Sequence, residues 1–327
     1  MRTPMSRVEV VAIVTAGFLL LAVMAPVLAQ TAERDNRQRC AANVRGIAQS
    51  MHVYGADNDD EYPTIPSKSA TTYDAALKPA VGAKIRDLTY AMIYQQGKIS
   101  NNPLACLWLL VLRGDVAPKQ FVCPSDPFAA KPVDAPANAD RAVAGAPALN
   151  LKITAPTGEY YMNFPDSKDV SYSLAYPWVE STDSNGKTMI SHGGYWRAMA
   201  DASIPIISDM APYLGSKAGA GQPATRPATA APAAAVDPTW ATTKAASQNH
   251  QFAGQNVAFG DAHAEFQASP KVGQNGDSIF GIRKDGAKQD GDEIPLEAGT
   301  LPHPLTGKFG TYDTVMVPTR DAKGELK

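Results

Sequence analysis

Several residue patterns that mark common enzymes and nucleic-acid-binding proteins are missing from this sequence of 327 residues. It contains no Gly-x-Ser-x-Gly, no His-Glu-x-x-His and no phosphate-cradling glycine loop, which are signatures of serine hydrolases, zinc proteases and nucleotide-binding enzymes. Its 30 basic and 32 acidic residues give a net charge of −2, and the basic residues form no patch in the sequence. We therefore expect a protein that is not an enzyme and does not bind nucleic acid.

Cysteine is scarce, because Cys40, Cys106 and Cys123 are the only three in the chain. None belongs to a Cys-x-x-Cys pair, which argues against a structural zinc site. Cys106 lies in an apolar segment at 104–115 that predicts a buried helix, and Cys123 lies in a strand-like segment. One expectation is a disulfide between Cys106 and Cys123 in an oxidising compartment, with Cys40 left over. The alternative is that all three are small, buried apolar side chains.

The N-terminus, in contrast, carries a run of twenty uncharged residues from Val10 to Ala29, directly after Glu9. A helix of that length spans about 30 Å, which matches the hydrocarbon thickness of a bilayer. Residues 1–29 can then be a secretory signal cleaved before Gln30, or a membrane anchor that remains in place. A third interpretation rests on a resemblance to a known family.

The residues PMSRVEVVAIVTAGFLLLAVMAP resemble the leader of type IV pilins and type II secretion pseudopilins. In that family a proline follows the leader glutamate after seventeen residues, as Pro26 follows Glu9 here. The resemblance implies processing between Pro4 and Met5, and a role for Glu9 in neutralising the N-terminal amine of a neighbouring subunit during assembly. It also implies a single-pass inner-membrane protein whose main part lies outside the cytoplasm, with secretion as the alternative location.

An amphipathic helix is predicted directly after this run. Apolar residues recur there at steps of four and three and would form one buried face: Cys40, Val44, Ile47, Met51 and Tyr54. Gly55 is expected to end the helix. We expect the apolar run and this face to form one long helix that is kinked at Pro26.

The rest of the chain indicates a β-rich domain. Short apolar runs between turn residues predict strands within 160–165, 170–179 and 204–210, and 256–267 predicts a hairpin. Residues 215–240 are nearly all Ala, Pro, Gly and Thr, which predicts a flexible insertion. With 44% hydrophobic residues the chain can bury a sizeable core.

The predicted fold class is therefore α+β. Residues 1–29 would form the membrane anchor or prepilin-like leader, and residues 30–327 a periplasmic or otherwise extracytoplasmic head. In this arrangement, as in pilins, a long N-terminal transmembrane and amphipathic helix packs on a mostly antiparallel sheet.

Four further segments, RCAANVRGIAQSMHVYGADNDDEYP, QFVCPSDP, SYSLAYPW and SQNHQFAGQNVAFGDAHAEF, resemble a large bacterial family of pilin-like proteins of unknown function. In that family a His is followed after nine or ten residues by Asp-Gly. His250 and Asp261 correspond to the His and Asp, and Ala262 replaces the glycine. The resemblance implies a non-enzymatic, pseudopilin-like subunit of the cell envelope or a type II secretion-type system. Its partners would be the inner membrane, further copies of itself or other pilin-like subunits.

Two sets of residues offer metal ligands. His250, Asp261 and His263, with Asp209, could bind zinc or a similar ion if they converge, although histidines beside a turn also satisfy backbone groups. The acidic run at 289–293 could supply oxygen atoms to calcium, as in some pseudopilins, or be a solvated turn. No other cofactor is expected.

A different function would follow if aromatic side chains of the head were exposed. A secreted or tethered binding module could recognise a carbohydrate or a peptide with four such residues: Tyr176, Trp178, Tyr195 and Trp196. The other role expected for these four residues is packing in the core.

Overall fold

The computed structural model describes residues 7–69, 72, 81–82, 101–129, 160–161, 163–164, 169–211, 246–283, 293–295 and 314–317. Within the N-terminal helix, the described side chains are those of 13–18 and 30–56. The predicted processing residues Pro4 and Met5, the Ala/Pro-rich segment 215–240 and residues 289–292 of the acidic run lie outside the described residues.

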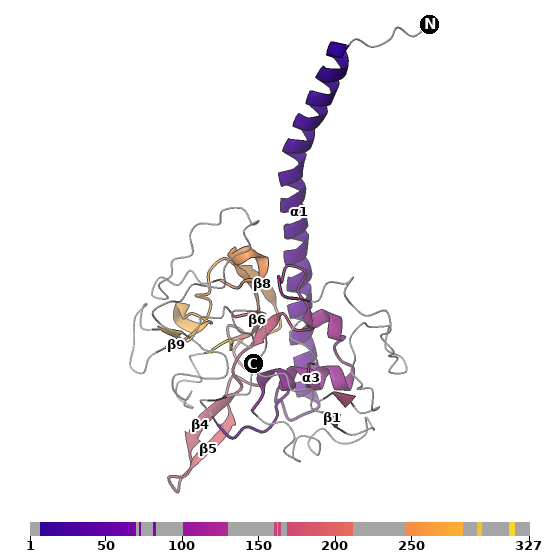
Figure 1. Ribbon diagram of the computed structural model, residues 1–327. Coiled ribbons are helices and arrows are strands. Elements are labelled where there is room, and N and C mark those ends of the chain that lie inside the picture. Colours follow the sequence, from indigo (N-terminus) through magenta and orange to yellow (C-terminus); the bar gives the residue numbers. More distant parts are fainter. Residues whose placement is uncertain are drawn as a thin grey trace.

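One helix, α1 (Arg7–Ala56), enters the globular part of the molecule with its C-terminal half (Figure 1). The apolar run and the amphipathic face thus form a single helix, as predicted, and this helix continues through Pro26. All members of the predicted buried face are buried, Tyr54 at 9% exposure and the other four at 0%. They hold α1 against strands of the main sheet.

The predicted transmembrane role of α1 is contradicted. Crossing a bilayer takes about 20 consecutive, predominantly apolar residues. No helix in the described part of the chain is both long and apolar enough to cross a membrane. This finding overturns the predicted transmembrane helix and the predicted single-pass inner-membrane location.

A second helix, α3 (Pro103–Arg113), confirms the buried helix that the sequence predicts. Asn102 caps its start, because its Oδ1 accepts a hydrogen bond of 3.2 Å from the backbone N–H of Ala105. Gly114 ends it in the left-handed conformation, with φ of 87°. Every residue from Pro103 to Leu112 is buried, so α3 is enclosed by the core and also contacts α1.

The main sheet consists of four antiparallel strands in the order β3-β6-β7-β8. These strands are β3 (Tyr172–Leu174), β6 (Pro205–Asp209), β7 (Gln255–Phe259) and β8 (Ala264–Gln267). All residues of the two central strands, β6 and β7, are buried. Helix α1 packs on this sheet through β6, β7 and β8, which makes the protein α+β with antiparallel sheets, as predicted.

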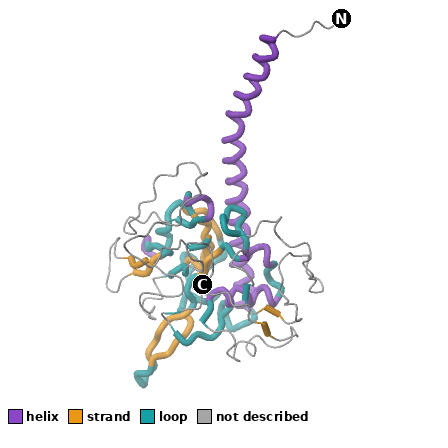
Figure 2. Tube along the Cα trace, in the orientation of Figure 1, coloured by secondary structure: helices purple, strands orange, loops and turns teal. Residues whose placement is uncertain are grey.

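Three smaller antiparallel pairs and three short 3-10 turns complete the described elements. The pairs are β1 (Val81–Gly82) with β2 (Tyr160–Tyr161), β4 (Trp178–Thr182) with β5 (Thr188–His192), and β9 (Gly281–Arg283) with β10 (Glu293–Pro295). The turns are η1 (Pro118–Phe121), η4 (Asn249–Phe252) and η5 (Gln274–Gly276). Figure 2 shows the strands gathered beside the C-terminal half of α1, while its N-terminal half extends away from them.

The predicted hairpin is formed by β7 and β8, and it turns through Gly260 and Asp261. Ala262 completes the turn with φ of 64°. This left-handed conformation costs a residue with a β-carbon about 1–2 kcal/mol, whereas glycine adopts it freely. The alanine therefore preserves the turn at an energetic cost.

Candidate functional site

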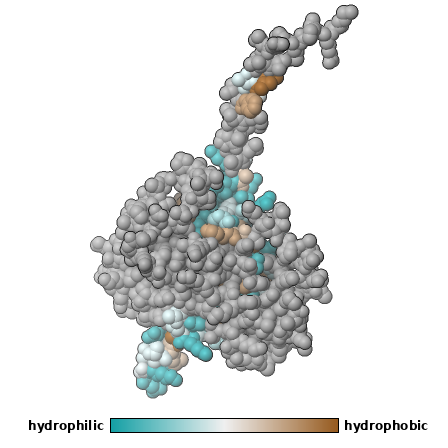
Figure 3. Space-filling view, viewed as in Figure 1, coloured by the Kyte–Doolittle hydropathy of each residue, from teal (hydrophilic) through white to brown (hydrophobic). Residues whose placement is uncertain are grey.

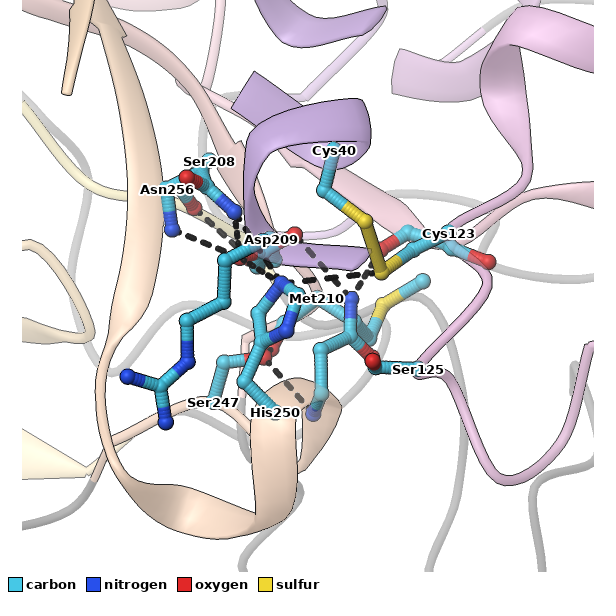
Figure 4. Close-up of polar contacts among 12 residues, drawn as sticks. Cys40, Cys123, Ser125, Ser208, Asp209, Met210, Ser247, His250 and Asn256 are labelled. Atoms are coloured by element: carbon cyan, nitrogen blue, oxygen red, sulfur yellow. Dashed lines mark hydrogen bonds and ion pairs between the residues drawn. A yellow bond between two sulfur atoms is a disulfide. The ribbon is translucent and has the colours of Figure 1, made fainter. Parts of the chain in front are cut away.

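A buried charged cluster joins α1 to the sheet, with His250 at its centre (Figure 4). Nδ1 of the imidazole lies 2.8 Å from Oε1 of Glu33, in α1. Nε2 lies 3.3 Å from Oδ2 of Asp209, the last residue of β6. Because a carboxylate only accepts hydrogen bonds, Nδ1 carries a hydrogen and donates it to Glu33.

The loop that presents His250 has an unusual backbone. Residues 250–252 all have positive φ, at 55°, 59° and 61°, and none of them is glycine. Such a conformation persists only where the surroundings hold it in place. Ser247 donates a hydrogen bond of 2.7 Å to the carbonyl of Met210, and Asn249 donates one of 2.9 Å to the carbonyl of Ser171. Both bonds fix the loop to the sheet region.

Asp209 is fully buried, and its carboxylate is surrounded by donors. The backbone N–H of Asn256 donates to Oδ2 at 2.6 Å, and the Asn256 side-chain amide does so at 3.1 Å. Asn249 donates to Oδ1 at 3.2 Å. These hydrogen bonds offset the loss of water around a buried carboxylate.

The charges of the cluster shift the protonation of His250. Burial alone would lower the pKa of His250, but the hydrogen bonds and charges of Asp209 and Glu33 outweigh burial and raise this pKa to about 9. For Glu33, burial raises the pKa, but hydrogen bonds from His250 and Ser125 outweigh it, so the pKa is lowered overall. At neutral pH the site is thus an imidazolium between two carboxylates.

A disulfide lies against this cluster. It joins Cys40 of α1 to Cys123, with Cα atoms 5.4 Å apart. The predicted pair of Cys106 and Cys123 is wrong, because Cys106 is a free, buried thiol within α3. Sγ of Cys123 lies 3.6 Å from Nε2 of His250, so the disulfide and the charged cluster form one site.

The other predicted metal ligands lie elsewhere. Asp261 and His263 are exposed, and their side chains contact each other at the hairpin turn. The His263 ring also stacks on Phe259, with ring centroids 4.5 Å apart. The structure therefore does not bring this pair together with His250.

Among the described residues, a different group of potential metal ligands converges. It consists of Cys40, Cys123, Asp209 and His250, whose ligand atoms all lie within 4.8 Å of one another. Asp209 and His250 were expected as a possible part of a ligand set, whereas the two cysteines were not.

The four aromatic residues considered for ligand binding belong to the core. Each is at most 2% exposed. Nε1 of Trp178 donates to the carbonyl of Ile65 at 3.1 Å, and Nε1 of Trp196 donates to Oγ1 of Thr64 at 2.8 Å. Their indole nitrogens are therefore used inside the protein, and packing is the expectation that the structure confirms.

Cys123, His250 and Asp209 have the composition of a Cys-His-Asp catalytic relay. However, the sulfur is held in the disulfide, and all three residues are 0% exposed. In this form they cannot contact a substrate, because a nucleophilic cysteine has to be an accessible thiolate. The arrangement instead holds the segment of Cys123, the loop of His250 and the end of β6 next to one another.

Glu33 is the main site residue that the sequence did not predict. The buried face continues towards the N-terminus at the same steps of three and four, through Arg37 to Glu33. A charged side chain at a position that spacing assigns to a buried face indicates a buried partner. The predicted buried face, extended by two steps towards the N-terminus, therefore carried this signal.

No protein-family model, curated protein or solved structure matched this chain. Its role therefore has to be inferred from its own residues.

Proposed function

We propose that this chain is a non-enzymatic, pilin-like structural subunit that assembles with further copies of itself through the N-terminal half of α1. One observation carries the proposal: α1 is fastened to the globular part along its C-terminal half, whereas its N-terminal half extends beyond it (Figure 1). Ile13, Val14 and Phe18 on the extended part are 59%, 52% and 70% exposed. Figure 3 shows apolar surface on this part of the helix.

The C-terminal half of α1 is held by several kinds of contact. The first two are the disulfide at Cys40 and the ion pair at Glu33. A third is a cation–π contact, in which the Arg37 guanidinium lies 4.5 Å from the centre of the Phe266 ring. Arg45 also donates a hydrogen bond of 3.2 Å to a backbone carbonyl of β8. A helix fixed in this way can present its free half in a defined direction.

The exposed apolar side chains favour a partner. Val14 and Phe18 are four residues apart, so they lie on the same face of the helix. Burying a large apolar side chain is worth about 1.5–3 kcal/mol. A second copy is the partner that we propose, because it carries the same apolar face, and identical faces can form a symmetric, self-complementary contact. The resemblance to pilins points to the same partner.

The carbohydrate- or peptide-binding alternative receives no support from the residues on which it rested. Those aromatic side chains are buried, and their polar atoms are bonded inside the protein. A structural subunit needs no exposed ligand site on the head.

Sedimentation velocity over a range of protein concentrations tests the proposal. We expect the wild type to form oligomers and a Val14→Ser/Phe18→Ser variant to remain monomeric. Glu9→Ala should also weaken association, if Glu9 acts on a neighbouring subunit as the resemblance implies. The matched control is Val53→Ser, which alters an apolar side chain that is 56% exposed on the same helix, within the half that contacts the head. A wild type that stays monomeric, or a double variant that associates like the wild type, would overturn the proposal.

A further inference from the structure

We propose that the reduced form of this chain binds one zinc ion through Cys40, Cys123, Asp209 and His250, in the place that the disulfide now occupies. This inference is independent of the assembly role. Two thiolates, an imidazole and a carboxylate form a four-ligand set that suits tetrahedral zinc. All four residues are fully buried, and their ligand atoms lie within 4.8 Å of one another.

The distances at His250 agree with the edges of a zinc tetrahedron. Bonds of about 2.3 Å to sulfur and about 2.0–2.1 Å to nitrogen and oxygen place nitrogen about 3.6 Å from sulfur and about 3.3 Å from oxygen. Nε2 of His250 lies 3.6 Å from Sγ of Cys123 and 3.3 Å from Oδ2 of Asp209. The two edges that meet at Nε2 of His250 therefore already have the lengths that the metal requires. The two sulfur atoms would have to move apart to about 3.8 Å, which cleavage of their bond permits.

The surrounding hydrogen bonds are those that orient metal ligands. Glu33 accepts from Nδ1 of His250 at 2.8 Å, so the opposite nitrogen, Nε2, faces the cysteines and Asp209. Glu33 is itself held by Ser125, whose hydroxyl donates at 2.6 Å. A carboxylate behind a histidine is the usual outer partner of a zinc ligand. A disulfide requires neither a histidine beside it nor a carboxylate behind that histidine.

The side-chain amide of Asn256 keeps an acceptor, the Asp209 carboxylate, in both forms of the site. Its amide nitrogen lies 3.0 Å from Nε2 and 3.1 Å from Oδ2 of Asp209. In the reduced, metal-bound form, Nε2 binds zinc, and the amide can still donate to the Asp209 carboxylate. The outer hydrogen bonds of the site thus survive the exchange of disulfide for metal.

The two forms interconvert by a balanced reaction. A dithiol reductant supplies two electrons and two protons, the bond between Cys40 and Cys123 breaks, two thiols form, and the reductant becomes a disulfide. Zinc binding then releases one proton from each thiol, and any proton on Nε2 of His250, to the solvent. Zinc and the disulfide therefore exclude each other.

Cobalt(II) is the spectroscopic probe for this site. The full chain is reduced with dithiothreitol, freed of reductant without oxygen, and titrated with Co²⁺. We expect one equivalent to bind with the visible bands of tetrahedral cobalt and a thiolate charge-transfer band whose intensity indicates two thiolates. Zn²⁺ should displace the cobalt, and the oxidised chain should show no such bands.

Variants separate the ligands from their neighbours. Cys40→Ser and His250→Gln should remove the tetrahedral bands, whereas the matched control Cys106→Ala should retain them. Glu33→Gln, at a positioning residue, should keep the tetrahedral spectrum but bind cobalt about 10–100-fold more weakly. Retention of the bands in Cys40→Ser, or their loss in Cys106→Ala, would refute this assignment of ligands.

Alkylation of the wild type provides a test that does not depend on whether the variants fold. Zn²⁺ should protect Cys40 and Cys123 of the reduced chain from iodoacetamide, with the modified positions identified by peptide mass spectrometry. Equal alkylation of these two cysteines with and without Zn²⁺, or the absence of tetrahedral cobalt bands in the reduced wild type, would overturn the proposal.

Discussion

Glu33 and His250 form a 2.8 Å ion pair between residues that are 217 positions apart in the sequence. Glu33 belongs to the helix that extends from the head, and His250 belongs to the strained loop before β7. The pair therefore couples the position of α1 to the conformation of that loop. Since His250 is fully buried, the loss of Glu33 would remove the acceptor of its Nδ1–H and leave Asp209 as the remaining carboxylate beside the imidazolium.

We expect Glu33→Gln to lower the free energy of unfolding of the oxidised protein by about 1–3 kcal/mol, because it weakens a hydrogen bond between charged groups. Urea denaturation at pH 7 measures this change. The control is Glu265→Gln, an exposed position on β8, for which a change within about 0.5 kcal/mol is expected. Equal stability of the two variants would show that the pair contributes nothing to folding.

The disulfide should contribute more to stability than any single polar contact. Cys40 and Cys123 are separated by 83 positions, and closing a loop of that length stabilises a fold by about 4–5 kcal/mol in the chain-entropy model. In urea denaturation, the free energy of unfolding of Cys40→Ser should be lower than that of the wild type by most of this amount. Peptide mapping without reductant should recover a linked Cys40–Cys123 peptide. A linked Cys106–Cys123 peptide would contradict the pairing.

Cys106 should be unreactive in the native protein. Burial raises the pKa of its thiol from about 9 to about 12, against the weaker opposing effect of backbone hydrogen bonding at Ile65. The thiol thus remains protonated at pH 8, and iodoacetamide should modify it only after unfolding.

The same shift predicts a dependence of stability on pH. The folded protein holds the Cys106 proton more tightly than the unfolded chain does, so this contribution is complete below about pH 9 and is lost as the pH rises towards 12. Between pH 8 and pH 11, the wild type should lose more unfolding free energy than Cys106→Ala. Parallel pH profiles for the two proteins would contradict this assignment.

Ala262→Gly should stabilise the hairpin. Glycine adopts positive φ at this position without the cost that alanine has. Its greater conformational freedom in the unfolded chain offsets part of this benefit, so we expect the free energy of unfolding to rise by about 0.5–1 kcal/mol. Thermal or urea unfolding measures it. Ala264→Gly, two residues later within β8, should instead destabilise the protein by a similar amount. Loss of stability in both variants would show that the turn is not strained.

Local patterns in the sequence predicted the elements whose structure depends on neighbouring residues. The buried face of α1, helix α3 and the β7–β8 hairpin all follow from apolar spacing and turn residues that lie close together in the chain. The length of an apolar run was a weaker guide, since it predicted a membrane span that the described helices do not provide.

The charged cluster could not be predicted in the same way, because its members come from distant segments. The partners of His250 lie in α1 and at the end of β6, and their meeting depends on how the helix docks on the sheet. The pairing of Cys40 with Cys123 has the same origin. A search for Cys-x-x-Cys tests only neighbouring ligands, so it says nothing about a ligand set assembled by tertiary structure.

The position of the disulfide also determines how the molecule would carry tension. A pull on the extended end of α1 would reach the covalent bond at Cys40 and pass directly to Cys123, which lies 83 positions further along the chain. Residues 41–122, including α3, lie inside the closed loop and would be shielded from extension. Reduction of this one bond would place that whole stretch in the path of the force.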